Sequence, residues 1–472
     1  MKVLLLRPFV DTTVGISPPL SIMYLSSFLK SKNLEVGLID KCIDRDAIGE
    51  FCFENPFIKN LFREIERHNP DIMGMTLFSR ELTDIAVLCR LIRKRFKSIY
   101  IVLGGPHPTA MPRETIEQIP ECDFVVRGEG ELTLYDLIQN ISKGISLNLI
   151  KGVSFRNTET GEVFHGEDRD AVTDLDYFPF PDREALLGNY QGNRYGSFLY
   201  GTPSDIVITS RGCPYQCNFC FKVCKKYRAR SPKNVIEEIR WIVKNVSPRS
   251  VQIMDDSFTI EKDRASKILD YLIADRHPCR FKLRSRVDAV DEGLLEKMRK
   301  AGVDTIVYGF ESGAQDMLKA FNKQTTLEQN IRACRLTKAK GINCFGDMIL
   351  FYPGETQKTI YETRQFLKRA RPTGVRFYTL SPLPGTKVYQ EAKQGGFLIS
   401  DWGVNMASPW IRLKDFGDLN EMEQIAKMMF IKSLLNPISI CWMLKSFGRY
   451  FFKTPYLYLR LMMCSLAKKT KY

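Results

Sequence analysis

The chain has 472 residues, a formal net charge of +15 and 13 cysteines. It contains no repeats or low-complexity tracts, and no run of about 18 uncharged apolar residues that would span a bilayer. The apolar run after Met1 is too short for a secretory signal core, and most cysteines lie singly in apolar patterns. These features exclude a secreted disulfide scaffold. They predict a cytoplasmic protein, in which clustered cysteines bind metal.

Residues 1–145 alternate between strand and helix patterns. The expected strands begin KVLLLRPF at residue 2, LEVGLID at 34, DIMGMTLFS at 71, IYIVLGG at 99 and CDFVVRGEGE at 122. This order predicts a doubly wound, flavodoxin-like α/β domain with ligands at the carboxyl ends of its strands. A dinucleotide site is excluded, because the first strand runs into RPFVDTTVGISPP without a GxGxxG turn. A mononucleotide site stays open, although no phosphate loop is visible.

Residues 146–200 are expected to form a linker or strap between two domains. The stretch IKGVSFRNTETGEVF, from residue 150, predicts a hairpin with a Thr-Gly turn. The following DLDYFPFPDRE, from residue 174, is interrupted by prolines and is therefore expected to be extended.

Residues 201–400 alternate again, now with six expected strands. These begin DIVIT at 205, VQIMD at 251, FKLRSR at 281, DTIVYG at 304, FGDMIL at 345 and GVRFYTL at 374. Helical patterns lie between them, near 233–246, 262–275, 292–301, 326–340 and 357–369. Such alternation predicts a parallel sheet with right-handed crossovers. Polar or glycine-rich residues follow the strands, at the end where α/β barrels keep their chemistry.

The stretch RGCPYQCNFC follows the first of these strands and holds Cys213, Cys217 and Cys220. A structural zinc ion takes four ligands, and Cys224 could be the fourth. A 4Fe–4S cluster has four irons, so three cysteines would leave one iron open for a substrate. The long loop between a strand and a helix favours the cluster, and the zinc site remains the alternative.

The CxxxCxxC spacing, with Phe219 before the last cysteine, resembles the cluster loop of radical S-adenosylmethionine enzymes, which carry a partial (β/α)6 barrel. In that family the open iron chelates S-adenosylmethionine and an electron from the cluster cleaves it to a 5′-deoxyadenosyl radical. The resemblance places Phe219 at the cofactor.

The same resemblance implies roles for side chains at the strand ends. Asp255 and Asp256 occupy the place that binds the amino group of S-adenosylmethionine. Arg284 or Arg286 is expected to pair with its carboxylate, with a surface ion pair as the alternative. Glu311 is expected to face the ribose or the substrate.

A doubly wound domain before such a barrel resembles the cobalamin-binding radical enzymes. The loops at 79–80, 104–112 and 127–131 fit that group, with Gly104 and Gly105 allowing close approach of the backbone to the corrin or its tail. The chain lacks the DxHxxG motif of cobalamin-binding mutases. We therefore expect cobalamin without its own base as ligand and without a histidine from that motif. His107 is expected to contact the loop or tail rather than the cobalt.

The implied activity is methylation of an unactivated carbon on a small-molecule or lipid-like substrate, with a 4Fe–4S cluster, S-adenosylmethionine and cobalamin as cofactors. An external electron donor, such as flavodoxin or ferredoxin, is implied as partner. Radical oxidation, cyclisation or rearrangement without methyl transfer is the first alternative. The second is a methylthiotransferase acting on RNA or protein, whose second cluster would need cysteines such as Cys52, Cys89 and Cys122. A corrinoid-binding protein without turnover is the third.

Residues 401–472 are expected to form a helical segment. Its last part, residues 431–472, carries eight lysines and arginines with eight aromatic residues and no acid. This composition predicts either a helix at the inner membrane face or a helix packed on the barrel. Nucleic acid binding is the less favoured alternative.

Overall fold

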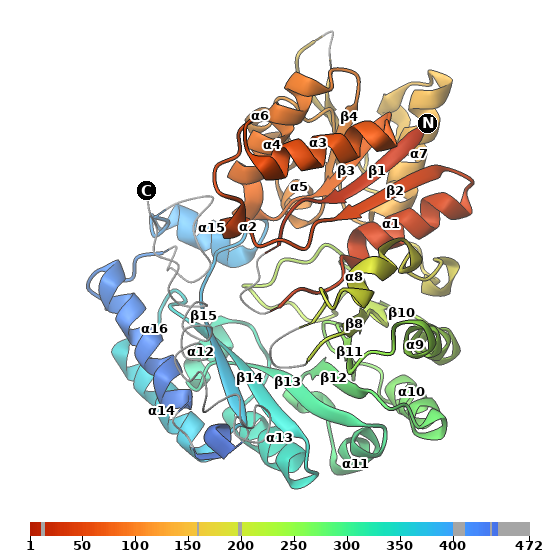
Figure 1. Ribbon diagram of the computed structural model, residues 1–472. Coiled ribbons are helices and arrows are strands. Elements are labelled where there is room, and N and C mark those ends of the chain that lie inside the picture. The colour runs from red at the N-terminus through yellow and green to blue at the C-terminus, as the bar shows by residue number, and fades with distance from the viewer. Residues whose placement is uncertain (11–14, 158–159, 197–200, 400–410, 435–436, 442–472) are drawn as a thin grey trace. The chain divides into compact units, whose positions relative to one another are not determined.

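The computed structural model describes residues 1–10, 15–157, 160–196, 201–399, 411–434 and 437–441 (Figure 1). These residues form two compact units. The first consists of Met1–Tyr195 and Phe221–Arg228, and the second contains the remaining described residues.

The first unit is built on a seven-stranded sheet with the order β2-β1-β3-β4-β5-β6-β7. Its first five strands run parallel to their neighbours, as the sequence predicted. They are β1 (Lys2–Arg7), β2 (Glu35–Asp40), β3 (Ile72–Thr76), β4 (Tyr100–Gly104) and β5 (Phe124–Val126). The predicted flavodoxin-like order is confirmed, with loops 79–80, 104–112 and 127–131 at the carboxyl edge.

The hairpin expected in the linker belongs to this sheet instead. Strands β6 (Val153–Arg156) and β7 (Val163–His165) continue the sheet in antiparallel fashion from β5. Val153 and Phe155 are buried in the core of the first unit, which gives the hairpin apolar contacts that a free strap would lack. The first unit therefore extends to Tyr195 rather than ending near residue 145.

Helices cover both faces of the first sheet (Figure 1). Apolar residues of α1 (Leu20–Ser31) and α7 (Gly130–Lys143) share one core with Val3, Leu5 and Val102. The opposite face is covered by α3 (Pro56–His68) and α4 (Leu82–Arg95). Short helices complete the unit: α2 (Arg45–Ile48), α5 (Pro106–Ala110), α6 (Pro112–Gln118) and α8 (Leu187–Gln191).

The second unit contains a six-stranded parallel sheet with the order β15-β14-β13-β12-β11-β8, the partial barrel that the sequence predicted. The strands are β8 (Ser204–Val207), β11 (Ser250–Ile253), β12 (Arg280–Ser285), β13 (Val303–Glu311), β14 (Asn343–Leu350) and β15 (Gly374–Thr379). Two short strands, β9 (Ser210–Arg211) and β10 (Arg228–Ala229), flank the cysteine loop.

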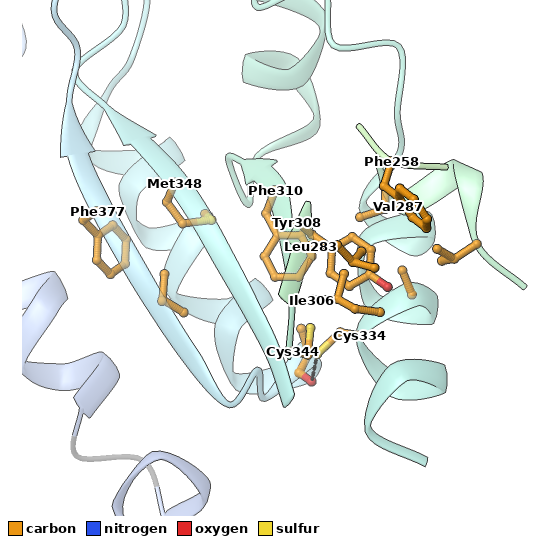
Figure 2. Close-up of a cluster of buried hydrophobic side chains, with 14 of the residues drawn as sticks. Phe258, Leu283, Val287, Ile306, Tyr308, Phe310, Cys334, Cys344, Met348 and Phe377 are labelled. Carbon is orange, nitrogen blue, oxygen red and sulfur yellow. Dashed lines mark hydrogen bonds between the residues drawn. The ribbon is translucent and has the colours of Figure 1, made fainter. Parts of the chain in front are cut away.

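One face of this sheet packs on helices through a large apolar core, part of which Figure 2 shows. Ser231 caps the first helix by accepting from the backbone of Asn234 at 3.1 Å, as its position before Pro232 predicted. The helices are α9 (Pro232–Val246), α10 (Lys262–Asp275), α11 (Glu292–Lys300), α12 (Gln315–Ala320), α13 (Leu327–Ala339), α14 (Gln357–Ala370) and α15 (Lys387–Gln394).

The described part of the C-terminal segment packs on the barrel. Helix α16 (Leu419–Leu434) buries Met422 and Met429 in the barrel core, and the Ser439 hydroxyl donates to the Thr373 carbonyl at 2.8 Å. Residues 442–472, which carry most of the expected membrane-facing charge, lie outside the described residues. Within the described ranges, no helix has the length and apolar character needed to cross a bilayer.

Candidate functional site

Asp255 binds the chain between β8 and the start of β9, directly before the cysteine loop. The Asp255 carboxylate accepts from the Thr209 backbone at 2.6 Å and from the Ser210 backbone and hydroxyl at 3.1 and 2.8 Å, and it also binds the Thr209 hydroxyl. Burial raises the pKa of Asp255, and the donors on Thr209 and Ser210 act against this rise. With its oxygens engaged, Asp255 orders the loop entrance, whereas the neighbouring Asp256 is exposed.

The loop is tied to the segment after α12. The backbone of Asn218 donates to the Phe321 carbonyl at 2.9 Å, and the Asn322 amide donates to the Gln216 carbonyl at 2.7 Å. Phe219 packs edge-on against Phe321, with ring centroids 5.6 Å apart. These contacts hold the backbone between the second and third cysteines in one arrangement.

The three cysteines differ in exposure. Cys213 and Cys217 are half-buried and Cys220 is exposed, and none of the described cysteines forms a disulfide. Burial raises the pKa of Cys217, while the nearby cations of Lys323 and Arg286 lower it. Among the described residues, no three His, Cys, Asp or Glu side chains surround a single ion. Each cysteine of a cubane binds a different iron, so its ligands need not converge on one point, and three thiols, one of them near two cations, suit a cluster.

A buried ion pair lies beside the cysteine loop. The Lys323 ammonium contacts a Glu311 carboxylate oxygen at 2.7 Å, with side chains 10% and 9% exposed. Glu311 has a positive φ of 61° at the end of β13. A Cβ on Gly309 would lie 2.2 Å from a Glu311 oxygen and 2.8 Å from the Lys323 nitrogen. A side chain at position 309 would therefore clash with the ion pair in its present arrangement.

Two arginines of the RSR stretch have different surroundings. Arg286 donates to both Asp288 oxygens at 2.9 and 2.8 Å and to the Lys323 carbonyl at 3.1 Å. Its guanidinium also lies 3.6 Å from the centroid of the Tyr215 ring, within the cysteine loop. Arg284 is half-buried and has no ion pair or hydrogen bond from its side chain to any described residue.

A further carboxylate, Glu355, follows β14. It is 2% exposed and accepts from the backbone of Phe351, which has a positive φ of 66°. Burial raises the pKa of Glu355 to about 8, although the backbone donors of Phe351 and Tyr352 act in the opposite direction. This side chain holds the polar loop YPGET in shape at the carboxyl edge of the barrel.

The loops after β3, β4 and β5 in the first unit are linked to one another. Gly105 has a positive φ of 101°, and a Cβ there would lie 2.8 Å from Thr76. The Thr109 hydroxyl donates to the Gly105 carbonyl at 2.7 Å and accepts from the Gly128 backbone at 2.9 Å. Gly128 has a φ of 72°, and apart from its chain neighbours no atom of the described residues lies within 4 Å of the position of a Cβ there. This open, hydrogen-bond-ordered edge suits close approach of a flat ligand.

His107 lies inside this loop region rather than at its surface. It is 1% exposed, and its Nδ1 contacts the Ser79 hydroxyl at 3.0 Å. Burial lowers its pKa to about 4, so the imidazole is neutral at pH 7. In contrast with Gly105, a Cβ on Gly104 would meet only Val126, at 3.5 Å.

The segment directly after Cys220, Phe221–Arg228, belongs to the first unit. Arg228 donates to the two oxygens of Glu129, in the RGEGE loop, at 2.9 and 2.8 Å. The Cys224 thiol donates to the same carboxylate at 3.4 Å. Cys224 is thus engaged by a loop of the first unit.

Sequence reasoning placed the three cysteines, Asp256, Glu311 and Arg286 on loops or strand ends of the barrel, which is where the structure has them. It missed Lys323 and Tyr215. Lys323 lies in the connection FNKQT, whose composition is that of any exposed turn, and no spacing rule connects it to Glu311. Tyr215 lies within the cysteine loop, but its contact with Arg286 depends on the fold of the loop.

Comparisons with known proteins agree with this architecture. Residues 207–367 match the Radical SAM superfamily and residues 6–138 match the B12 binding domain. The chain is 29% identical over 451 residues to an uncharacterized methyltransferase of Pyrococcus horikoshii, with 93% of each chain covered. It is 28% identical over 403 residues to the anaerobic magnesium-protoporphyrin IX monomethyl ester cyclase of Rubrivivax gelatinosus, covering 83% of this chain and 70% of that protein.

The structural comparison supports the fold across both units. The solved structure of the cobalamin-dependent S-adenosylmethionine radical enzyme OxsB with aqua-cobalamin bound has a TM-score of 0.75 and 22% identity, and covers 98% of this chain and 71% of that one. The two family matches contain the cysteine loop of the barrel and the linked loops of the first unit. The chain therefore belongs to the cobalamin-binding radical S-adenosylmethionine enzymes, which use a 4Fe–4S cluster, S-adenosylmethionine and cobalamin.

Proposed function

We propose that this enzyme transfers a methyl group to an unactivated carbon of a small-molecule or lipid-like substrate. The observation that supports methyl transfer is the similarity to the uncharacterized methyltransferase of Pyrococcus horikoshii over 93% of both chains. When bound, the cofactors supply a 5′-deoxyadenosyl radical and a methyl group, and the protein supplies position and electrostatics.

In the barrel, Cys213, Cys217 and Cys220 would hold the cluster, and Lys323 would favour the Cys217 thiolate. Glu311 is our proposed contact to the ribose or substrate of the family reaction. Glu311 is paired with Lys323, and its carboxylate could also accept a hydrogen bond from a ligand hydroxyl.

For S-adenosylmethionine, the structure favours Asp256 over Asp255 as the contact to the amino group, because the oxygens of Asp255 are bound within the barrel. Arg286 keeps its proposed role near the carboxylate, with a guanidinium oriented by Asp288 and Tyr215. Phe219 contributes by packing the loop on Phe321.

Cobalamin would lie on the loops at 79–80, 104–112 and 127–131. Gly105 and Gly128 adopt backbone conformations that favour glycine, and Gly104 and Gly105 lie where the backbone would approach the ligand. His107 is enclosed and bonded to Ser79, which supports cobalamin binding without histidine ligation.

Radical cyclisation, oxidation or rearrangement without methyl transfer is the second candidate. The similarity to the Rubrivivax cyclase over 83% of this chain favours it. A methylthiotransferase is disfavoured by the first unit: Cys89 and Cys122 are buried, and burial raises the pKa of both thiols, that of Cys122 to about 12. Buried thiols of this kind are poor cluster ligands.

The test is anaerobic incubation of the reconstituted enzyme with trideuteromethyl-labelled S-adenosylmethionine, hydroxocobalamin, a chemical or flavodoxin reductant, and cell extract. Methyl transfer predicts a metabolite that gains one labelled methyl group, detected by mass spectrometry, and no such gain with the three cysteines replaced by alanine. Formation of 5′-deoxyadenosine together with a product that lacks the label would replace methylation by the second candidate.

The proposed contact of residues 431–472 with anionic membranes has its own test. Full-length enzyme should sediment with anionic vesicles at low salt and be released at high salt, since each cation near such a surface contributes about 1 kcal/mol. If the protein stays in the supernatant at low salt, the membrane proposal is wrong and the packed-helix interpretation remains.

A further inference from the structure

One face of the barrel sheet is turned away from its helices and carries Arg284. Strand side chains alternate between the two faces, and Leu283, Ile306 and Met348 point into the helix-covered core (Figure 2). Arg284 follows Leu283 and is paired in register with Val307 of the neighbouring strand. Both residues therefore lie on the opposite, concave face of the partial barrel.

Two arginines near this face are paired with carboxylates, whereas Arg284 is not paired with any described carboxylate. Arg376 donates to both oxygens of its register partner Asp347 at 2.7 and 2.8 Å. Arg286 is held by Asp288 in the same way. Arg284 is half-buried, yet its side chain makes no ion pair or hydrogen bond with the residues that the structure describes.

An unpaired, partly desolvated guanidinium is costly, and its nearest neighbours on the face do not compensate it. Lys282, two residues earlier on the same strand face, is buried, and burial lowers its pKa to about 7 although the Asp304 carboxylate raises it. The residues two positions before and after Arg284, Lys282 and Arg286, are both basic, which favours an anionic ligand.

Apolar side chains are exposed on the same face. Met254 directly follows Ile253, which pairs with Leu283, so Met254 lies beside Arg284. Met254 is 36% exposed and Tyr378, on the edge strand β15, is 37% exposed. Met254 thus offers an apolar surface next to a cation, and Tyr378 extends the apolar surface of the same face, three strands from β12 along the sheet.

We propose that Arg284 is a specificity-determining residue that binds an anionic oxygen group of the substrate, a carboxylate or a phosphate, while the apolar part of the same molecule lies on Met254 and Tyr378. This inference rests on the proposed function, and it identifies the substrate as an amphiphilic acid. Arginine matches such groups with two parallel donors, which also fixes the orientation of the bound molecule toward the reacting carbon.

The first test measures binding directly, with full-length anaerobically reconstituted enzyme and three probes: octanoate, octyl phosphate and 1-octanol. Calorimetry should show that at least one of the two anions binds, and that Arg284→Gln weakens it by about tenfold to a hundredfold. The tighter of the two anions identifies the group. Arg332→Gln, which removes an exposed arginine of α13, is the matched control and should bind like the wild type.

Three results would overturn the inference: binding of neither anion, equal binding to the wild type and Arg284→Gln, or binding of octanol as tight as that of the anions. The affinity for S-adenosylmethionine should be the same in wild type and Arg284→Gln. A parallel loss would assign Arg284 to the methionine carboxylate and also overturn the inference. Anion binding through Arg284 without any methylated product would instead refute the proposed function and leave the anion site standing.

Discussion

The ion pair between Lys323 and Glu311 predicts a large loss of stability from a single substitution. Its atoms are 2.7 Å apart, and the side chains are 10% and 9% exposed. Removing one partner of a buried pair costs about 3–5 kcal/mol, because the other charge stays buried and unpaired. Since both side chains keep slight exposure, Lys323→Met should lower the free energy of unfolding of the barrel by about 3 kcal/mol.

A double variant separates the pair from its surroundings. Lys323→Met with Glu311→Leu removes both charges, so the loss should fall to about 1 kcal/mol, well below the sum of the losses of the two single variants. Leucine at 311 keeps the strain of the positive φ that glutamate already has, so backbone strain does not differ between the variants.

Tryptophan fluorescence can follow the barrel through Trp241 of α9, which packs against the barrel core, and none of the four tryptophans lies in the sequence of the first unit. In urea, Lys323→Met should shift the midpoint by about 1 M or more. The control is Lys262→Met, which breaks the exposed 2.9 Å pair with Asp291 and should cost below about 1 kcal/mol. The reasoning is refuted if Lys323→Met and the control Lys262→Met lose the same stability. It is also refuted if the double variant loses as much as Lys323→Met and Glu311→Leu together.

Three further predictions concern other parts of the chain. Burial raises the pKa of Glu355 to about 8, so between pH 5 and 8 the folded protein holds a proton that the unfolded chain releases. Barrel stability should therefore fall as pH rises from 5 to 8, and the urea midpoints of Glu355→Gln should lack this slope. Gly105→Ala should destabilise the first unit by about 1–3 kcal/mol, measured by thermal circular dichroism, because its φ is 101° and the Cβ would lie 2.8 Å from Thr76, while Gly104→Ala should have little effect. Cys224→Ala should retain about four irons per chain after anaerobic reconstitution, and loss of iron would favour a four-cysteine site.

Most of the architecture follows from local patterns in the sequence. The six barrel strands and the five helices between them were predicted from apolar periodicity, and all are present. Such elements can be read locally because each buries a face whose spacing is set by its own backbone. The hairpin at 153–165 shows the limit of this reasoning, because its strands have the same pattern whether they stand alone or extend a sheet.

The role of Asp255 also depends on tertiary structure. Adjacent carboxylates after a strand look alike in a sequence, and both lie beyond Ile253, the last residue of β11, so strand alternation does not assign them to a face. Asp255 points inward and binds Thr209 and Ser210, while Asp256 is exposed. Which of the two carboxylates turns inward depends on the donors of the neighbouring loop.

The direction of Glu311 required information that no local pattern contains. The register between β13 and β14 shifts between Gly309 and Glu311, and Glu311 consequently pairs with Met348. This irregularity, together with the positive φ at 311, turns the carboxylate toward Lys323 instead of continuing the alternation of the strand. The turn requires the absence of a side chain at 309, because a Cβ there would occupy the space of both charged groups. The sequence GFES thus indicates a carboxylate at the strand end, but its partner and its orientation beside the cysteine loop come from a bulge that depends on the neighbouring strand.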